Sequence, residues 1–211
     1  MQRDNSFSKD ISSKRGQFIG KVHCILQEFH FANPMVKMNL ISKFATSFYG
    51  SSLWSIFDGM CDKFFTAWNN TVRDTFGLPR GSHRYFIEEI SDHLHPMVMF
   101  SSRFVQFHRT LQANPKSCMR YLSSLSSFNS RTAYCKNLRT IMEKSNSDAD
   151  RFNVSSAHVK RIMKYCRVPE NSGWKVKVVQ DLLELRWNLI DIDVLEDDTD
   201  LEALVSQICL S

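Results

Sequence analysis

Apolar side chains recur at intervals of three and four residues through the first third of the chain, a spacing that places them along one face of an α-helix. This pattern covers residues 16–30, 34–48 and 58–76. Asn33 and Pro34 form a helix start signal, an N-cap followed by proline at the first helical position. Gly77 suits a helix C-cap, and Pro79 prevents the helix from continuing. The sequence therefore predicts three helices joined by short turns, which together form a compact bundle.

The later part of the chain keeps the helical pattern. Further helices are predicted at 83–92, 96–113, 115–125, 131–144, 154–167, 173–187 and 199–209. Residues 190–194 alternate like a short strand, but a single strand has no partner to pair with. We therefore predict an all-α fold with these divisions: a disordered lead at 1–15, a helical bundle at 16–80, a basic helical region at 81–145, a linker at 146–153, and C-terminal helices with an acidic tail at 154–211.

Composition is compatible with a packed helical core. Hydrophobic residues make up 43% of the 211 residues, and 16 of them are phenylalanine. No run approaches the roughly 20 apolar residues that a membrane span needs. The first residues are polar and lack the apolar core of a signal peptide, so a nuclear or cytoplasmic protein without a membrane partner is expected. The six cysteines contain no Cys-x-x-Cys pair, which indicates reduced thiols and no zinc site.

Charge is distributed unevenly along the chain. Residues 1–180 hold 26 Lys and Arg against 13 Asp and Glu, whereas residues 181–211 hold one Arg and nine acids. No acid lies between Asp92 and Glu143. That interval carries Arg103, Arg109, Lys116, Arg120, Arg131, Lys136 and Arg139. Such a segment is either an ordinary solvated helix face or a positive field that attracts a polyanion.

Residues for catalysis are not evident. The only adjacent aspartates, Asp197 and Asp198, lie in an acidic stretch with no strand pair around them, so a solvated loop is expected there rather than a metal site. His93 and His95 lack a third ligand and are expected to be turn residues before Pro96. There is no glycine-rich phosphate loop and no recognisable nucleophile motif. The sequence predicts no enzyme activity, no metal site and no cofactor in this chain.

Several cationic side chains are placed to contact a phosphate backbone. Arg80, His83 and Arg84 lie in a turn that opens a helix, where backbone amides and arginine forks bind phosphate well. The alternative for Arg80 and Arg84 is pairing with Glu88 or Glu89. The residues expected to contact nucleic acid are Lys63, Arg73, Arg80, His83, Arg84, Arg103, His108, Arg109, Arg120, Arg131, Lys136 and Arg139.

Aromatic residues near these cations are either core residues or stacking platforms. Phe104 and Phe107 share a face with Leu111 and are expected in the core. Tyr121 and Tyr134 are the candidates for stacking on single-stranded nucleic acid.

Three linked motifs carry a resemblance to a known family. They read Phe44-x-x-Ser47-x-Tyr49-Gly50-Ser51-x-Leu53-Trp54, then Phe65-Thr66-Ala67-Trp68-x-x-x-Val72-Arg73, then Leu78-Pro79-x-x-x-His83-Arg84. This run resembles the thumb and C-terminal domain of reverse transcriptases from LINE-type, non-LTR retrotransposons, in the part just downstream of the catalytic palm. Two positions depart from the family pattern: Asn70 stands where a basic residue is common, and Ser82 where threonine is common.

The resemblance implies a role in target-primed reverse transcription. The helical bundle at 16–80 would be the thumb that holds an RNA–DNA duplex, and the following domain would bind template RNA or target DNA. The palm, an RNA-directed DNA polymerase with its magnesium ions, is missing, so this chain would be a non-catalytic fragment that binds template and primer. Two alternatives remain: a helical module that docks on a protein such as the rest of the polymerase, which an exposed Trp54, Trp187 or Phe128 would favour, or a non-functional relic of a retrotransposon reading frame.

Overall fold

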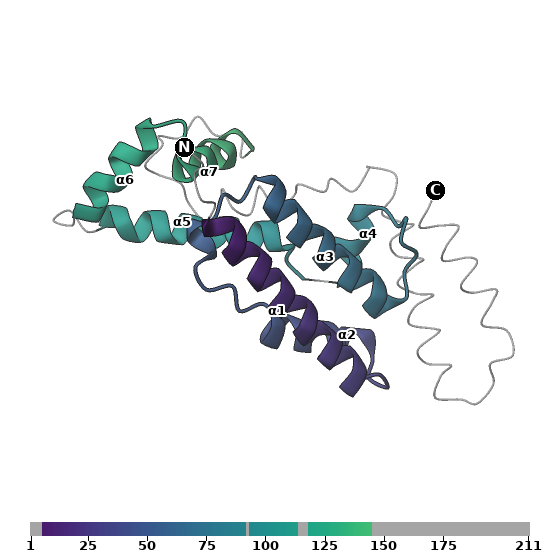
Figure 1. The fold of residues 1–211 in the computed structure, drawn as a ribbon. Helices are drawn as coiled ribbons and strands as arrows, with labels where there is room; N and C mark the ends of the chain where they lie inside the picture. Colours follow the sequence, from purple (N-terminus) through teal and green to yellow (C-terminus); the bar gives the residue numbers. More distant parts are fainter. Residues whose placement is uncertain (1–5, 92, 114–117, 145–211) are drawn as a thin grey trace, which may run out of the picture. The chain divides into compact units, whose positions relative to one another are not determined.

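A computed structural model describes residues 6–91, 93–113 and 118–144 (Figure 1). Every regular element in this part of the chain is helical, which confirms the predicted all-α fold there. The predictions for 146–211, including the linker, the later helices and the acidic tail, lie outside the described residues. The elements are α1 (Ser6–Glu28), α2 (Pro34–Leu40), a π-helical turn (Ile41–Ala45), a 3-10 turn (Ser51–Leu53), α3 (Gly59–Phe76), α4 (Arg84–Ser91), α5 (Pro96–Ala113), α6 (Cys118–Phe128) and α7 (Ala133–Lys144).

The described residues belong to two compact units that interleave along the chain. Unit one contains residues 6–17, 47–66 and 94–144, and unit two contains 18–46 and 67–93. The division does not coincide with the predicted boundary between 80 and 81. None of the described helices is both long and apolar enough to cross a membrane.

The core of unit one is a cluster of aromatic rings centred on Phe100 of α5. The Phe100 side chain is fully buried. Its ring centroid lies 5.3 Å from Phe48, 5.1 Å from Trp54 and 5.5 Å from Phe64, each in an edge-to-face arrangement. Phe65 adds a tilted contact at 6.0 Å. Edge-to-face pairs are favourable beyond the apolar area that they bury, so this cluster ties α5 to α3 and to the turn before α3.

A buried asparagine fixes α7 to the same core. The Asn137 side chain is 1% exposed. Its Nδ2 donates to the carbonyl oxygen of Trp54 at 2.7 Å, and its Oδ1 accepts from the backbone amide of Ile56 at 3.0 Å. These bonds satisfy two backbone groups of a loop that has no regular partner. Asn137 therefore determines how α7 docks on residues 54–56.

The predicted disordered lead at 1–15 is wrong for residues 6–15, which form the first turns of α1. The sequence there is polar, but Ile11 is only 3% exposed. In addition, Asp10 Oδ2 accepts a 2.7 Å hydrogen bond from Trp54 Nε1. A single buried apolar residue and one long-range hydrogen bond hold this segment, and neither produces a periodic sequence signal.

Unit two is built on α2 and α4, on the later part of α1 and on the end of α3. Phe18 stacks on Trp68 with ring centroids 5.8 Å apart. The predicted start of α2 is confirmed, because Asn33 Oδ1 accepts from the amide of Met35 at 2.9 Å and Pro34 occupies the first turn. Lys37 is buried, and its Nζ donates to the carbonyl oxygen of His30 at 2.7 Å.

The prediction of one continuous helix over 34–48 is wrong. The α-helix ends at Leu40 and continues as a π-helical turn over Ile41–Ala45. A π-helical turn contains more residues than an α-helical turn, so it changes which residues share a face. Phe44, which belongs to the apolar pattern predicted over 34–48, is 63% exposed.

Helix α3 agrees closely with its prediction. Its apolar stripe is buried at Cys61, Phe64, Phe65, Trp68, Val72 and Phe76. Gly77 has a φ of 65°, the left-handed conformation expected of a C-cap glycine. The amide of Leu78 donates to the carbonyl oxygen of Arg73 at 2.8 Å, the bond that defines a Schellman motif.

The buried thiol of Cys61 is expected to resist alkylation in the folded protein. Burial raises its pKa to about 12, and the charges of Asp58 and Asp62 add to this effect. Cys24 and Cys118 are exposed. Iodoacetamide at pH 8 should therefore modify Cys24 and Cys118 within minutes and leave Cys61 intact until urea is added, as peptide mass spectrometry can measure. Equal modification of all three thiols in the native state would contradict the burial of α3.

Candidate nucleic-acid interface

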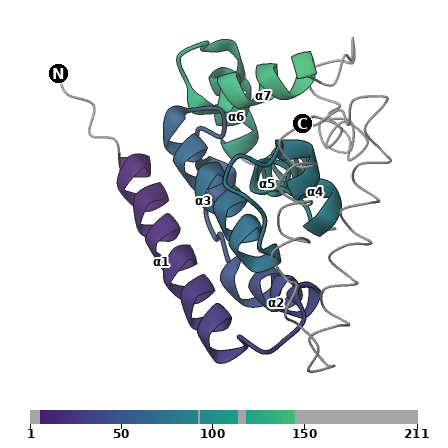
Figure 2. The ribbon, with the colours of Figure 1, turned by 90° about the vertical axis from the view of Figure 1, so that its right-hand side faces the viewer.

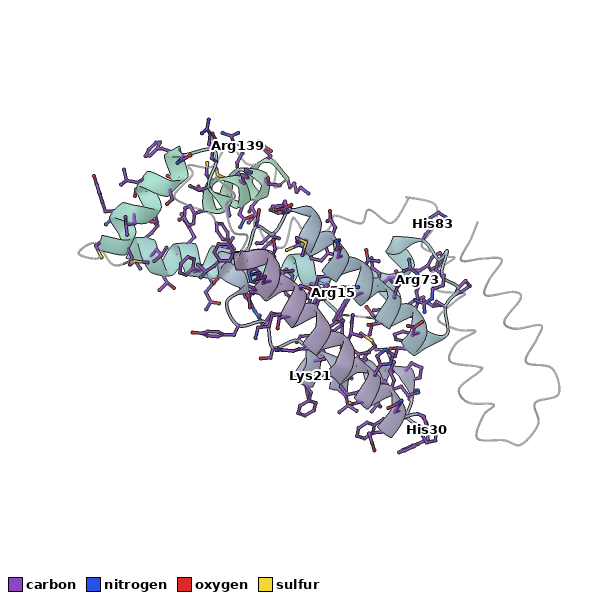
Figure 3. The ribbon with its side chains drawn as sticks, viewed as in Figure 1. Arg15, Lys21, His30, Arg73, His83 and Arg139 are labelled. Carbon is purple, nitrogen blue, oxygen red and sulfur yellow. The ribbon has the colours of Figure 1, made fainter. Side chains whose placement is uncertain are left out.

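The cations at the C-terminal end of unit one form an exposed, unpaired set. We call Arg109, Arg120, Arg131, Lys136 and Arg139 the cationic surface; all five side chains are exposed. Within the described residues none of their charged groups takes part in an ion pair or a hydrogen bond. Arg139 extends outward from α7 (Figure 3). All five residues lie in the interval that contains no acid, so their charge is not neutralised locally.

The helices α5, α6 and α7 position these side chains. Helix α6 contacts both α5 and α7 (Figure 2). In α7 the inner face is formed by Cys135, Leu138 and Ile141, which are buried, and this leaves Lys136 and Arg139 on the opposite side. Because residues three apart lie on nearly the same side of a helix, the two cations project together.

The turn between α6 and α7 is held by several short-range bonds. Thr132 Oγ1 donates to the carbonyl oxygen of Ser126 at 2.8 Å and accepts from the amide of Cys135 at 3.1 Å, which makes Thr132 the N-cap of α7. Asn129 Oδ1 accepts from the amide of Arg131 at 3.1 Å. The backbone of Arg131 is thereby fixed beside α7, while its side chain stays exposed.

His108 does not belong to this surface. Its side chain is 1% exposed, and its Nδ1 forms a hydrogen bond with the hydroxyl of Tyr134. The Tyr134 ring also packs against Phe104 at 5.3 Å. Burial raises the pKa of Tyr134, and hydrogen bonds with Ser123 and Gln112 oppose this shift. The expected roles of His108 in phosphate contact and of Tyr134 in base stacking do not fit this arrangement, because both side chains are used inside unit one.

Arg103 is also used within the protein. Its Nη1 donates to the carbonyl oxygen of Phe48 at 2.7 Å, and its guanidinium lies 5.7 Å from the centre of the Phe48 ring. Burial lowers its pKa below the ordinary value. The expected phosphate contact of Arg103 is replaced by a bond that holds the loop before the 3-10 turn against α5.

Arg73 has a comparable role in unit two. Its Nη2 donates to the carbonyl oxygen of Ser82 at 2.9 Å, and its Nη1 lies 3.4 Å from Asn70 Oδ1. Burial is the main cause of its lowered pKa; the charge of Arg80 adds to the shift, and that of Asp74 opposes it. Arg73 therefore links the end of α3 to the turn that precedes α4.

The turn between α3 and α4 leaves fewer free cations than expected. Arg80 pairs with Asp74, with Nη2 and Oδ1 2.8 Å apart. The side chains of Glu88 and Glu89, the partners expected from the sequence, lie outside the described residues. Both partners are well exposed, so this pair adds little stability. His83 is exposed in the same region as Arg73 (Figure 3). The side chain of Arg84 lies outside the described residues. Lys63, on α3 in unit one, is exposed as expected.

His95, just before α5, has a structural role. His95 is 2% exposed, and its Nδ1 accepts from the amide of Met97 at 3.2 Å, which caps the first turn of α5. Its ring also lies 5.1 Å from Phe65. Among the described residues, no group of three or more His, Cys, Asp or Glu side chains could hold a metal ion. The Asp197–Asp198 pair lies outside those residues.

Sequence reasoning singled out Tyr121 for stacking but missed the wider feature of α6, which buries serine and exposes several apolar residues. Tyr121, Leu122, Leu125 and Phe128 are between 51% and 72% exposed, whereas Ser123 and Ser127 are each 5% exposed. The helical spacing of these apolar residues was the available signal, but spacing alone cannot reveal which face of a helix is buried.

No protein-family model, curated protein or solved structure matches this chain.

Proposed function

We propose that this chain binds the phosphate backbone of nucleic acid through the cationic surface, as the template–primer-binding portion of a LINE-type reverse transcriptase. In this proposal the partner is RNA and DNA, as an RNA–DNA duplex. In this proposal the chain itself performs no catalysis, and any magnesium belongs to the polymerase palm. The main observation in support of this proposal is that five exposed cations have no ion-pair partner in the described part of the chain.

Electrostatics supports this proposal. Fifty consecutive residues, 93–142, contain no acid, so a polyanion that approaches α6 and α7 meets cations without competing carboxylates from this segment. Neutralising phosphates with Lys and Arg releases counterions, and this release supplies most of the affinity in non-specific binding. Arg103 and Arg73 contribute by holding loops in place rather than by contacting phosphate.

Two matched triple variants test the proposal. R131Q/K136Q/R139Q removes part of the cationic surface, and K9Q/K14Q/K43Q removes the same charge from α1 and the π-helical turn. Fluorescence anisotropy with a labelled RNA–DNA primer–template at low salt should show at least a tenfold loss of affinity for the first variant and less than a threefold loss for the second.

Equal losses in the two variants would mean that binding depends only on net charge, and the cationic surface would then have no special role. No binding by the folded wild-type chain at low salt would reject the proposed function. Circular dichroism confirms that each variant keeps its helical content.

A second candidate function is a helical module that docks on another protein. Of the aromatic residues that would favour it, Phe128 is 72% exposed, whereas Trp54 is fully buried and Trp187 lies outside the described residues. The exposed apolar residues of α6 are the specific observation in favour of this function.

A further inference from the structure

Helix α6 has an inverted distribution of polar and apolar residues. Cys118, Tyr121, Leu122, Leu125 and Phe128, which we call the outer face of α6, are all exposed. In an α-helix with 3.6 residues per turn, these five positions form one continuous stripe. Ser123 and Ser127 lie on the opposite side and are buried. An apolar stripe directed away from its own core is typical of a surface that contacts a ligand.

The buried serines show that this orientation is specified by the structure. Ser123 Oγ donates to the carbonyl oxygen of Arg120 at 2.8 Å and accepts from Gln112 Nε2 of α5 at 3.3 Å. Ser127 bonds in two ways: its Oγ donates to the carbonyl oxygen of Ser124 at 2.6 Å, and its own carbonyl oxygen accepts from Cys135 Sγ of α7 at 3.0 Å. Rotating α6 to bury the apolar stripe would break these contacts with both neighbouring helices.

The outer face includes two exposed aromatic rings that are two helical turns apart. Tyr121 is 68% exposed and Phe128 is 72% exposed. They are seven residues apart, which is two helical turns or about 10 Å along the axis. Leu122 and Leu125 lie between them on the same stripe. The flat face of an unpaired base can stack on each ring, and such stacking tolerates any base because every base has a π-face.

Charge around the outer face favours a nucleic acid over a second copy of the chain. Arg120 lies on α6 beside the stripe rather than within it, and Arg131 follows the helix. Both side chains are exposed and have no ion-pair partner in the described part of the chain. Two copies that met through this face would bring like charges together, at a cost. A single strand offers unpaired bases for the apolar stripe and phosphates for the arginines.

We infer that the outer face of α6 binds unpaired nucleotides of single-stranded DNA or RNA, with bases stacked on Tyr121 and Phe128 and phosphates on Arg120 and Arg131. The inference deepens the proposed function, on which it rests, and names a single strand as the ligand of this part of the surface. In a primer–template, the unpaired template beside the duplex has this chemistry.

The test uses the full-length chain and fluorescein-labelled dT12. The variant Y121A/F128A should bind dT12 at least tenfold more weakly than wild type, because alanine substitution of a stacking residue removes its contact with a base. The control variant F31A/Y49A removes two other exposed aromatic rings, which are 74% and 90% exposed, and should change dT12 affinity less than twofold. Because all four rings are exposed, circular dichroism should remain unchanged.

A second readout locates the ligand on α6. Cys118 lies on the outer face and Cys24 lies on α1; both thiols are exposed. Saturating dT12 should slow iodoacetamide modification of Cys118 at least fivefold and leave the rate at Cys24 unchanged, as measured by peptide mass spectrometry in the same sample.

These measurements distinguish a failure of this inference from a failure of the proposed function. If Y121A/F128A binds dT12 as tightly as wild type does, or if dT12 does not protect Cys118, the inference is wrong even where duplex binding through the cationic surface persists. If neither dT12 nor the primer–template binds, the proposed function fails as well. If the double substitution abolishes self-association of the chain and leaves dT12 binding intact, the outer face contacts protein and the inference is overturned.

Discussion

Replacing Phe100 by alanine is expected to lower the free energy of unfolding of unit one by about 3–5 kcal/mol, the usual cost of truncating a fully buried phenylalanine. The ring lies within 6.0 Å of four other aromatic rings, and these come from α3 and from the segment before it. Its removal leaves a cavity bounded by rigid side chains that cannot collapse easily. Urea unfolding followed by circular dichroism measures the change.

Two substitutions serve as controls for Phe100. F128A truncates the same residue type on an exposed helix position and should change stability by about 0.5 kcal/mol or less. F100L keeps most of the buried volume and should cost less than F100A. A loss below about 1 kcal/mol for F100A would show that the aromatic cluster does not form the core of unit one.

Replacing Asn137 by alanine should destabilise unit one by about 2–6 kcal/mol. The substitution leaves the carbonyl oxygen of Trp54 and the amide of Ile56 without their side-chain partner, and each unsatisfied buried group costs about 1–3 kcal/mol. Leucine at 137 is close in volume but cannot form either bond, so N137L should not rescue stability. Rescue by leucine would show that Asn137 acts by filling space.

A matched control for Asn137 is Asn39, an exposed asparagine near the end of α2. N39A should leave the urea midpoint within error of wild type. Because Trp54 is fully buried and its carbonyl oxygen is a partner of Asn137, its fluorescence should report the loosening in N137A. An unchanged midpoint for N137A would contradict the docking of α7 on residues 54–56.

Local patterns were sufficient to predict several parts of the fold. The stripe of α3, the Asn33 cap and the Gly77 C-cap each depend on residues within a few positions of one another, and each is confirmed. The start of α1 and the π-helical turn could not be predicted in this way. The first depends on a bond between Asp10 and Trp54, 44 residues apart, and the second on a change of helix type that apolar spacing does not encode.

The candidate interface was predictable only in part, for the same reason. The distribution of charge along the sequence indicated the interval that contains the cationic surface. It could not show which cations are exposed and which form hydrogen bonds within the protein. The acceptor of Arg103 is 55 residues away, and the hydroxyl that contacts His108 is 26 residues away. Which face of α6 is buried likewise depends on partners from α5 and α7, so the outer face emerges only from tertiary structure.

The salt dependence of primer–template binding tests the central claim most directly. Each lost phosphate contact should reduce the slope of log K against log salt concentration by about 0.9 for a duplex. If the cationic surface contacts phosphates, R131Q/K136Q/R139Q should flatten the slope by about 2–3, and K9Q/K14Q/K43Q should change it by less than about 1. A slope that is identical in wild type and R131Q/K136Q/R139Q would contradict the account, since those side chains would then contact no phosphate.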